Sequence, residues 1–145
     1  MADHVRRQLR EAVAVAVTGL VTTAARVFQS RVYPVQTAEL PGLLVHTDAE
    51  TDEQQLDLSY RREVDVVIEA KARATADLDD LLDEMAKEVE TALANGVTLG
   101  GRNVPLPLVG IVVERSDEGE QPTGTLTLTY QPTLYSAPGQ PDVLL

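Results

Sequence analysis

The residue types that most often carry catalysis or bind metal ions are sparse in this chain and form no recognised pattern. The two histidines, His4 and His46, do not share the short spacing of metal ligands, and isolated histidines usually have structural or solvent-exposed roles. There is no cysteine, so thiol nucleophiles, disulfides and thiolate ligands are excluded. No serine lies in the Gly-x-Ser-x-Gly turn that exposes a nucleophile. The sequence therefore predicts no nucleophilic centre and no metal site.

An acidic stretch at residues 47–55 matches a calcium-binding loop in one respect only. Asp48, Glu50 and Asp52 alternate as the first ligands of such a loop do. The loop also needs Gly at its sixth position and Glu at its twelfth, and here these positions hold Glu53 and Ser59. We therefore expect a solvated acidic connection, either a hairpin tip or a flexible loop, and no bound cation.

Paired carboxylates offer a third type of chemistry, general acid and base catalysis. Glu63, Asp65 and Glu69 alternate along one predicted strand, but they share its polar face with Lys71, as ordinary exposed pairs do. The glycine pair at residues 100–101 does not open a phosphate-binding loop, because the Lys-Ser/Thr pattern and a directly following helix are missing. We expect no enzyme activity and no cofactor.

Charge and composition exclude further classes of function. Acidic residues outnumber basic ones 23 to 12, so the formal net charge is −11 and the pI is about 4.5. Nucleic acid binding relies on clustered Lys and Arg, and the small group Arg6, Arg7 and Arg10 is expected to be a solvated helix face. Aromatic residues make up only 3% of the chain, which is few for a surface that stacks bases or sugars. No apolar run is long enough to span a membrane, and we expect a protein made and kept in the cytoplasm.

Two amphipathic helices are predicted from apolar residues that recur every three or four positions. The first covers residues 5–20, with Asp3 as its N-cap. The second covers residues 78–93, begins after Thr75 or Asp77, and has the cleanest apolar stripe in the chain. Burying this stripe contributes on the order of 10 kcal/mol before the entropy of ordering is subtracted.

Strands are predicted where β-branched and aromatic residues gather or where polar and apolar residues alternate. The predicted segments are residues 25–35, 43–47, 56–72, 107–115 and 123–134. In the longest segment, most even-numbered positions from Leu56 to Ala72 are apolar, which defines one buried face. An acidic tip at residues 116–121 separates the last two strands.

The order helix, strands, helix, strands predicts an α+β fold, with a mostly antiparallel sheet and both helices packed on one face. We expect a single domain over residues 1–135 and an extended C-terminal tail over residues 136–145. The tail ends in three apolar residues that a free monomer would leave exposed, and simple disorder is the alternative explanation for it.

This order of features resembles the tail terminator family of long-tailed bacteriophages, small proteins similar to minor tail protein U of lambdoid phages. The resemblance covers nearly the whole chain and is carried by the succession of its pieces. They are the first helix (5–20), Arg-Val-Tyr-Pro (31–34), Leu-Pro-Gly-Leu-Leu-Val (40–45), the long strand (61–70), the acidic helix start (77–82) and the closing strand (124–130).

The resemblance implies a structural virion protein. It implies a ring, expected to be a hexamer, that caps the tail tube, ends tube polymerisation and presents the surface that joins the head. The implied partners are further copies of this chain, the major tail tube protein and head–tail connector proteins, with no sequence-specific nucleic acid and no membrane. The implied location is the head-proximal end of the virion tail, after assembly in the host cytoplasm.

Two other functions stay open at this point. A head–tail connector or another neck component needs the same kind of ring-forming α+β subunit. A cellular domain that binds small molecules needs a pocket with converging polar groups, and the sequence has no convergent motif to line one. Rings use heterologous contacts, in which two different patches of each subunit meet. Our candidate interface residues are Glu63, Asp65, Glu69, Val143, Leu144 and Leu145.

Overall fold

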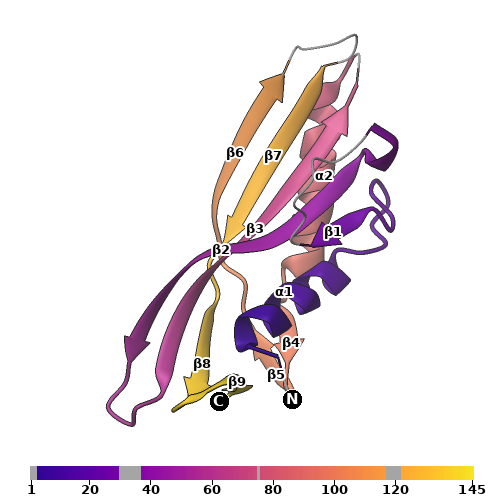
Figure 1. Cartoon of the computed structure of the whole chain (residues 1–145). Coiled ribbons are helices and arrows are strands. Elements are labelled where there is room, and N and C mark those ends of the chain that lie inside the picture. Colours follow the sequence, from indigo (N-terminus) through magenta and orange to yellow (C-terminus); the bar gives the residue numbers. More distant parts are fainter. Residues whose placement is uncertain (1–2, 30–36, 75, 117–121) are drawn as a thin grey trace.

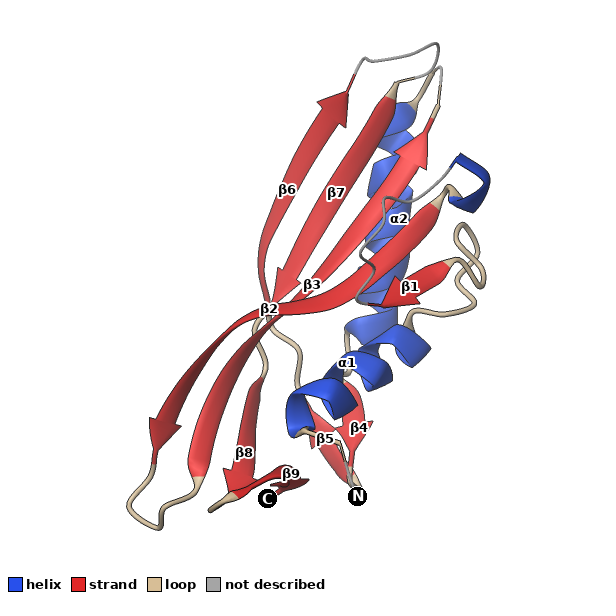
Figure 2. Cartoon of the chain, viewed as in Figure 1, coloured by secondary structure: helices blue, strands red, loops and turns tan. Residues whose placement is uncertain are grey.

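The structure, a computed structural model, describes residues 3–29, 37–74, 76–116 and 122–145. Its elements are α1 (Val5–Ala16), β1 (Val27–Gln29), η1 (Thr37–Glu39), β2 (Gly42–Gln54), β3 (Tyr60–Arg73), α2 (Leu78–Leu93), β4 (Val97–Leu99), β5 (Arg102–Val104), β6 (Leu108–Ser116), β7 (Thr123–Tyr130), β8 (Thr133–Ala137) and β9 (Gln140–Leu144). Helices α1 and α2 lie on the same face of a mostly antiparallel sheet (Figures 1 and 2). The predicted α+β class is therefore confirmed.

Strand β3 is the centre of the sheet, and the main strand order is β1-β2-β3-β7-β6. Among the described strands, β1 and β2 pair in parallel and all other neighbours are antiparallel. On one edge β3 pairs with β7 along residues 66–73 and with β8 along residues 60–63. The chain changes from β7 to β8 at Pro132, whose carbonyl accepts a hydrogen bond from the Val64 amide at 3.1 Å. Residues 50–63 of β2 and β3 thus extend beyond β7 as a long hairpin, which we call the arm (Figure 1).

The core lies between the sheet and the two helices. Its largest contributions come from the inner faces of both helices and from the central strands, and these side chains are at most 1% exposed. They are Leu9 and Val13 of α1, Val17 just after α1, Leu82, Met85 and Val89 of α2, Ile68 of β3 and Leu128 of β7. Alternation along β3 turns Val64, Val66 and Ile68 toward the helices, so the odd-numbered residues of this strand face the other way. Each fully buried aliphatic side chain contributes about 1.5–3 kcal/mol of transfer free energy.

The helix predictions are confirmed in position, with two corrections at α1. The helix ends at Ala16 instead of residue 20, because Gly19 adopts a left-handed φ of +87° that no helix continues through. The N-cap is His4 and not Asp3, since the His4 Nδ1 atom accepts a hydrogen bond from the Arg6 amide at 3.1 Å. Helix α2 has the expected bounds and follows Asp77, whose side chain makes no capping hydrogen bond.

The acidic stretch at residues 47–55 was expected to be a connection, and this prediction is wrong for most of its length. It continues β2 to Gln54, with Glu50 opposite Val64 and Asp52 opposite Arg62 on β3. This segment forms a strand because it pairs with β3 and because its carboxylates form ion pairs with arginines. These partners lie in other segments, so the residues of 47–55 alone do not predict the strand. The actual turn of the arm is residues 55–59.

Several predicted strand ends also differ from the structure. The strand expected at 25–35 is seen as β1, and residues 30–36 lie outside the described part. Strand β3 begins at Tyr60, so Leu56 and Leu58 belong to the turn and are exposed instead of buried. The segment 123–134 is divided by Pro132, which cannot donate to a sheet ladder. Residues 117–121 of the second acidic tip are outside the described residues.

The C-terminal residues 136–145, expected to form an extended tail, belong instead to the hairpin of β8 and β9. Strand β9 folds back on β8, and the Leu145 amide donates to the Tyr135 carbonyl at 2.9 Å. The Gln8 side chain of α1 donates to the Asp142 carbonyl at 3.0 Å, which fixes β9 against the first helix. The division into a domain over residues 1–135 and a separate segment stays a prediction.

Candidate assembly surfaces

The three carboxylates predicted on the long strand all lie on the sheet face that points away from the helices. Glu63 pairs with Arg61 at 2.7 Å, Asp65 accepts from Gln131 Nε2 at 3.0 Å, and Glu69 Oε2 lies 3.4 Å from His46 Nε2. Each carboxylate therefore has its own partner within the chain and does not share a site with the other two. This arrangement supplies surface charge and does not form an acid–base pair.

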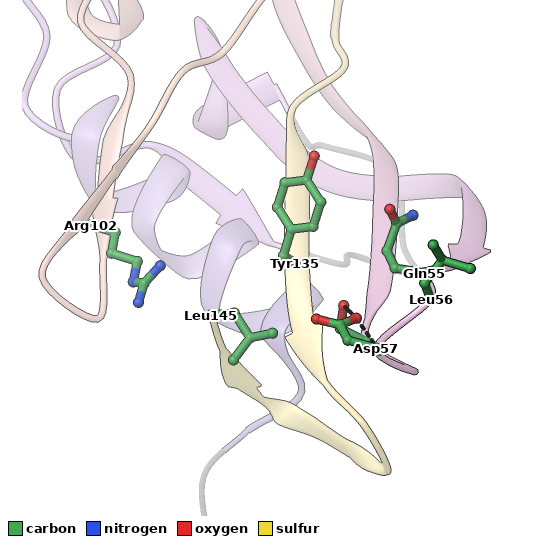
Figure 3. Close-up of a pocket in the computed structure, with 7 residues that line it drawn as sticks. Gln55, Leu56, Asp57, Arg102, Tyr135 and Leu145 are labelled. Atoms are coloured by element: carbon green, nitrogen blue, oxygen red, sulfur yellow. Dashed lines mark hydrogen bonds between the residues drawn. The ribbon is translucent and has the colours of Figure 1, made fainter.

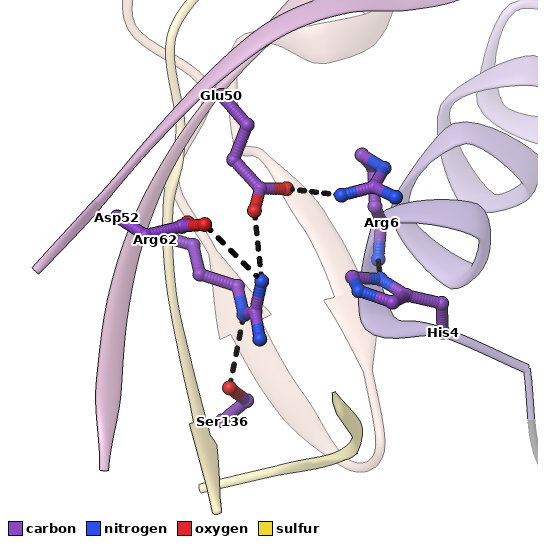
Figure 4. A network of polar contacts seen from close by, with 6 residues as sticks. All are labelled: His4, Arg6, Glu50, Asp52, Arg62 and Ser136. Atoms are coloured by element: carbon purple, nitrogen blue, oxygen red, sulfur yellow. Dashed lines mark hydrogen bonds and ion pairs between the residues drawn. The ribbon is translucent and has the colours of Figure 1, made fainter. Parts of the chain in front are cut away.

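A polar network on the opposite face ties the arm to the first helix (Figure 4). Glu50 bridges two arginines, with its oxygens 2.8 Å from Arg6 Nη1 and 2.8 Å from Arg62 Nη1. Arg62 also donates to Ser136 Oγ on β8 at 2.9 Å and lies 3.6 Å from Asp52. The side chains of Glu50 and Arg62 are only 10% and 11% exposed, so this network holds the arm, β8 and α1 in one arrangement.

The electrostatics of the network follow from its geometry. Burial alone would raise the pKa of Glu50, but hydrogen bonds from Asp52, Arg6 and Arg62 outweigh it and hold this pKa at about 2. The pKa of Asp52 is raised, first by burial and then by its hydrogen bond and charge repulsion with Glu50. Glu50 is therefore ionised in the folded chain, and its role here is to position the arm.

The turn of the arm borders an open hollow of about 530 Å³ at the end of the molecule (Figure 3). We call it the tip hollow; it is lined by Gln55, Leu56, Asp57, Ser59, Arg102, Tyr135 and Leu145. The turn is held by Asp57, which accepts hydrogen bonds from the Ser59 amide and hydroxyl, and these bonds lower the pKa of Asp57. Its lining holds no histidine, and its only acidic side chain is Asp57.

Apolar side chains with large exposed fractions surround this hollow. Leu56 is fully exposed and Leu58 is 59% exposed, although leucine is normally buried. Tyr135 and Leu145 are 43% and 41% exposed. Of the predicted C-terminal interface residues, Leu145 therefore lines the hollow, Val143 is exposed on β9, and Leu144 packs against the core.

A second apolar surface lies along β6, at the far edge of the sheet. Within the part of the chain that the structure describes, this strand pairs with β7 alone, and every one of its residues is exposed. We call residues 108–114 the β6 edge; its apolar members are Leu108, Val109, Ile111, Val112 and Val113. Helix α2 packs mainly on β3 and β7 (Figure 2). It contacts the end of β6 through the ion pair of Asp79 with Arg115 at 2.7 Å, but it leaves the apolar residues of this strand exposed.

Sequence reasoning predicted β6 as a strand but did not identify it as a surface. A continuous run such as Leu-Val-Gly-Ile-Val-Val is typical of a strand buried on both faces, and only the sheet order shows that this one is an edge. The exposed Leu56 and Leu58 were likewise assigned to a buried face. The predicted strand began four residues before the actual start of β3, so these two exposed leucines were counted among its buried positions.

Within residues 3–29, 37–74, 76–116 and 122–145, no cluster of three or more His, Asp or Glu side chains could hold a metal ion. The same residues contain no helix that is both long and apolar enough to cross a membrane. His4 caps α1, and burial followed by the nearby Arg6 charge lowers its pKa. His46 lies between Asp48 and Glu69, with Nδ1 2.8 Å from Asp48.

Comparisons with known proteins give similarities to solved structures alone. No protein-family model matches the chain, and no curated protein matches its sequence. Among solved structures, the chain is similar to a chain described as "Virion of native gene transfer agent (GTA) particle", with a TM-score of 0.49 and 19% identity. The similarity covers 90% of this chain and 92% of that one.

Proposed function

We propose that this chain is a structural subunit of a phage-like virion, and that copies of it form a ring that caps the tail tube. In this function the ring, expected to be a hexamer, stops tube polymerisation and offers the surface to which the head joins. The partners are other copies of the chain, the tail tube protein and head–tail connector proteins. The protein acts by binding, with no reaction of its own.

The observation that carries this proposal is the pair of separate apolar surfaces on one well-packed scaffold. The β6 edge and the tip hollow are formed by different elements and lie in different parts of the molecule (Figure 1). A ring needs two different surfaces on each subunit, because each copy contacts its two neighbours with different patches. The succession of elements, which resembles that of the tail terminator family, supports the same function.

Electron microscopy of particles assembled without this chain tests the proposal. Overlong tails are expected, because nothing stops the addition of tube subunits. Tails of normal length that fail to join heads would instead support the alternative of a head–tail connector or other neck component. Normal tails with heads attached would contradict both. Adding the chain back from a plasmid is the control, and it should restore the normal length.

A cellular small-molecule-binding domain is the remaining alternative. The tip hollow is broad and open, and two of its polar members, Asp57 and Ser59, are already hydrogen-bonded to each other. A specific ligand site normally encloses most of the ligand and aims free polar groups at it. This geometry favours a docking surface over a ligand site.

A further inference from the structure

We propose that the β6 edge of one copy docks in the tip hollow of the next copy. Each subunit then contacts one neighbour through β6 and the other through the arm, β8 and β5. This inference rests on the proposed function, because it specifies the contact by which copies of the chain join.

The middle of the β6 edge lacks charge and proline, two features that protect exposed strands from pairing, although an irregularity between Leu108 and Gly110 interrupts its ladder with β7. Proteins usually protect such edges with charged residues or proline, and residues 108–113 contain neither. The acidic outer half of β2, with Asp48, Asp52 and Glu53, shows that this chain does protect another edge in that way. The exposed fractions of Ile111, Val112 and Val113 are 44%, 58% and 40%, so apolar area on both faces of β6 is available for burial.

The turn of the arm, which borders the tip hollow, holds a leucine at a position whose backbone conformation is unfavourable for leucine. Leu58 has a φ of +71°, a left-handed conformation that glycine or asparagine adopts far more easily. Leu56 beside it has no cover at all. The Asp57–Ser59 hydrogen bonds and the Glu50–Arg62 pair keep this turn in place. The turn therefore presents exposed apolar side chains on an arm whose position is fixed by these contacts. Such a surface is suited to contact with an apolar partner surface.

Local charge complementarity favours a second copy as the occupant. With a net charge of −11, two copies repel each other unless they meet through surfaces poor in acidic residues. Residues 108–113 carry no charge, and the only acidic residue of the β6 edge is Glu114. The tip hollow contributes Arg102, which complements Glu114, and its lining holds one acidic side chain, Asp57.

The alternative contact between copies is β6 against β6. That contact is isologous, so it joins two copies, stops there and leaves the tip hollow uncovered. Docking of β6 in the hollow covers both apolar surfaces and can repeat around a closed ring. The two arrangements place different residues together, and cross-linking distinguishes them.

Cysteine cross-linking tests the proposal cleanly because the chain has no cysteine of its own. Val112→Cys and Leu56→Cys change one exposed residue on each surface, so both variants should keep the wild-type melting temperature. Equal amounts of the two are mixed and oxidised mildly, and the disulfide-linked dimers are separated by mass after one partner has been given a small tag. Val21→Cys is the matched control, since Val21 is 95% exposed but belongs to neither surface.

The expected result is a mixed Val112–Leu56 dimer that forms at least tenfold faster than dimers between Val21→Cys and either variant. Mixed dimers should also exceed the half share that random pairing gives. Predominant pairing of Val112→Cys with itself would overturn the proposal in favour of β6 against β6. Cross-linking no faster than the control would overturn it as well. Tail length in particles lacking the chain is independent of this result, so a failure here and a failure of the proposed function are distinguishable.

Discussion

Replacing Glu50 by glutamine removes the charge that holds Arg6 and Arg62 together while it preserves side-chain volume. The pair with Arg62 is nearly buried, whereas Arg6 is 40% exposed and its pair is screened by solvent. Breaking a buried pair costs about 3–5 kcal/mol, and an exposed pair is worth about 1 kcal/mol or less. Because the site is not fully enclosed, we expect Glu50→Gln to lower the free energy of unfolding by about 3 kcal/mol. For a chain of this size that corresponds to a melting temperature lower by about 9 °C.

The same substitution changes how stability depends on pH. The pKa of Glu50 is lowered from its ordinary value to about 2, so its charged form stabilises the fold. This stabilisation is complete above pH 4.5, the ordinary value, and is lost as the pH falls toward 2. The raised pKa of Asp52 acts in the opposite direction and makes the acid loss shallower. Glu50→Gln should therefore remove part of the decline in stability seen in the wild type below pH 4.5.

Chemical denaturation at pH 7 and at several acidic pH values measures both effects. Glu53→Gln is the matched control, because Glu53 is an exposed residue of the same strand outside the network. It should change the free energy of unfolding by less than about 0.5 kcal/mol. Equal stability of Glu50→Gln and wild type at pH 7, with parallel curves in acid, would refute the structural role assigned to the network.

Further predictions concern the core, one turn, one buried hydroxyl and assembly. Leu128→Ala should lower the free energy of unfolding by about 2–5 kcal/mol in denaturation, because Leu128 is fully buried between sheet and helices. Gly96→Ala should cost more than about 1 kcal/mol, since Gly96 has a φ of +74° and a Cβ there would lie 2.2 Å from the Val104 carbonyl oxygen; an unchanged melting temperature would contradict this. Tyr130→Phe should raise stability by about 1 kcal/mol, because the buried hydroxyl has no hydrogen-bond partner among the described residues and burial raises the pKa of Tyr130 to about 12. Self-association followed by sedimentation should strengthen when salt is raised from low to physiological levels or divalent cations are added, because the subunits carry a charge of −11; weakening would count against charge repulsion between copies.

The regular amphipathic pattern was enough to predict most of the scaffold. Helix α2 has the expected bounds because its apolar stripe and its flanking residues both act locally. The even-numbered residues of β3 from Val64 onward form the predicted buried face for the same reason. Such elements are defined by their own residues, so a single sequence is sufficient to find them.

Elements that depend on distant partners could not be predicted in the same way. The acidic half of β2 is a strand because Arg62 on β3 and Arg6 on α1 neutralise Glu50, and neither arginine is close to it in sequence. The β4–β5 hairpin was missed because its strands are three residues each, although Gly100 and Gly101 with positive φ are a typical hairpin turn. The exposure of β6 depends on which strands α2 covers. The residues of β6 carry no information about the position of that helix.

The candidate surface was predicted only in part, for a related reason. Charge and apolar character identify residues such as Glu63 and Leu145 as candidates, but the sheet order decides which of them share a surface. The structure brings Leu145 to the tip hollow and packs the partly buried Leu144 against the core. Whether Glu63, Asp65 and Glu69 contact another subunit stays a prediction.

The most direct test of this account is to add the purified chain to isolated tail tubes and examine them by electron microscopy. Ring-shaped density is expected at one end of each tube, and the bound chain should sediment with the tubes in a ratio of about six copies per tube end. The result that would contradict it is a chain that stays in solution at its monomer mass of 15.7 kDa while the tube ends remain unchanged.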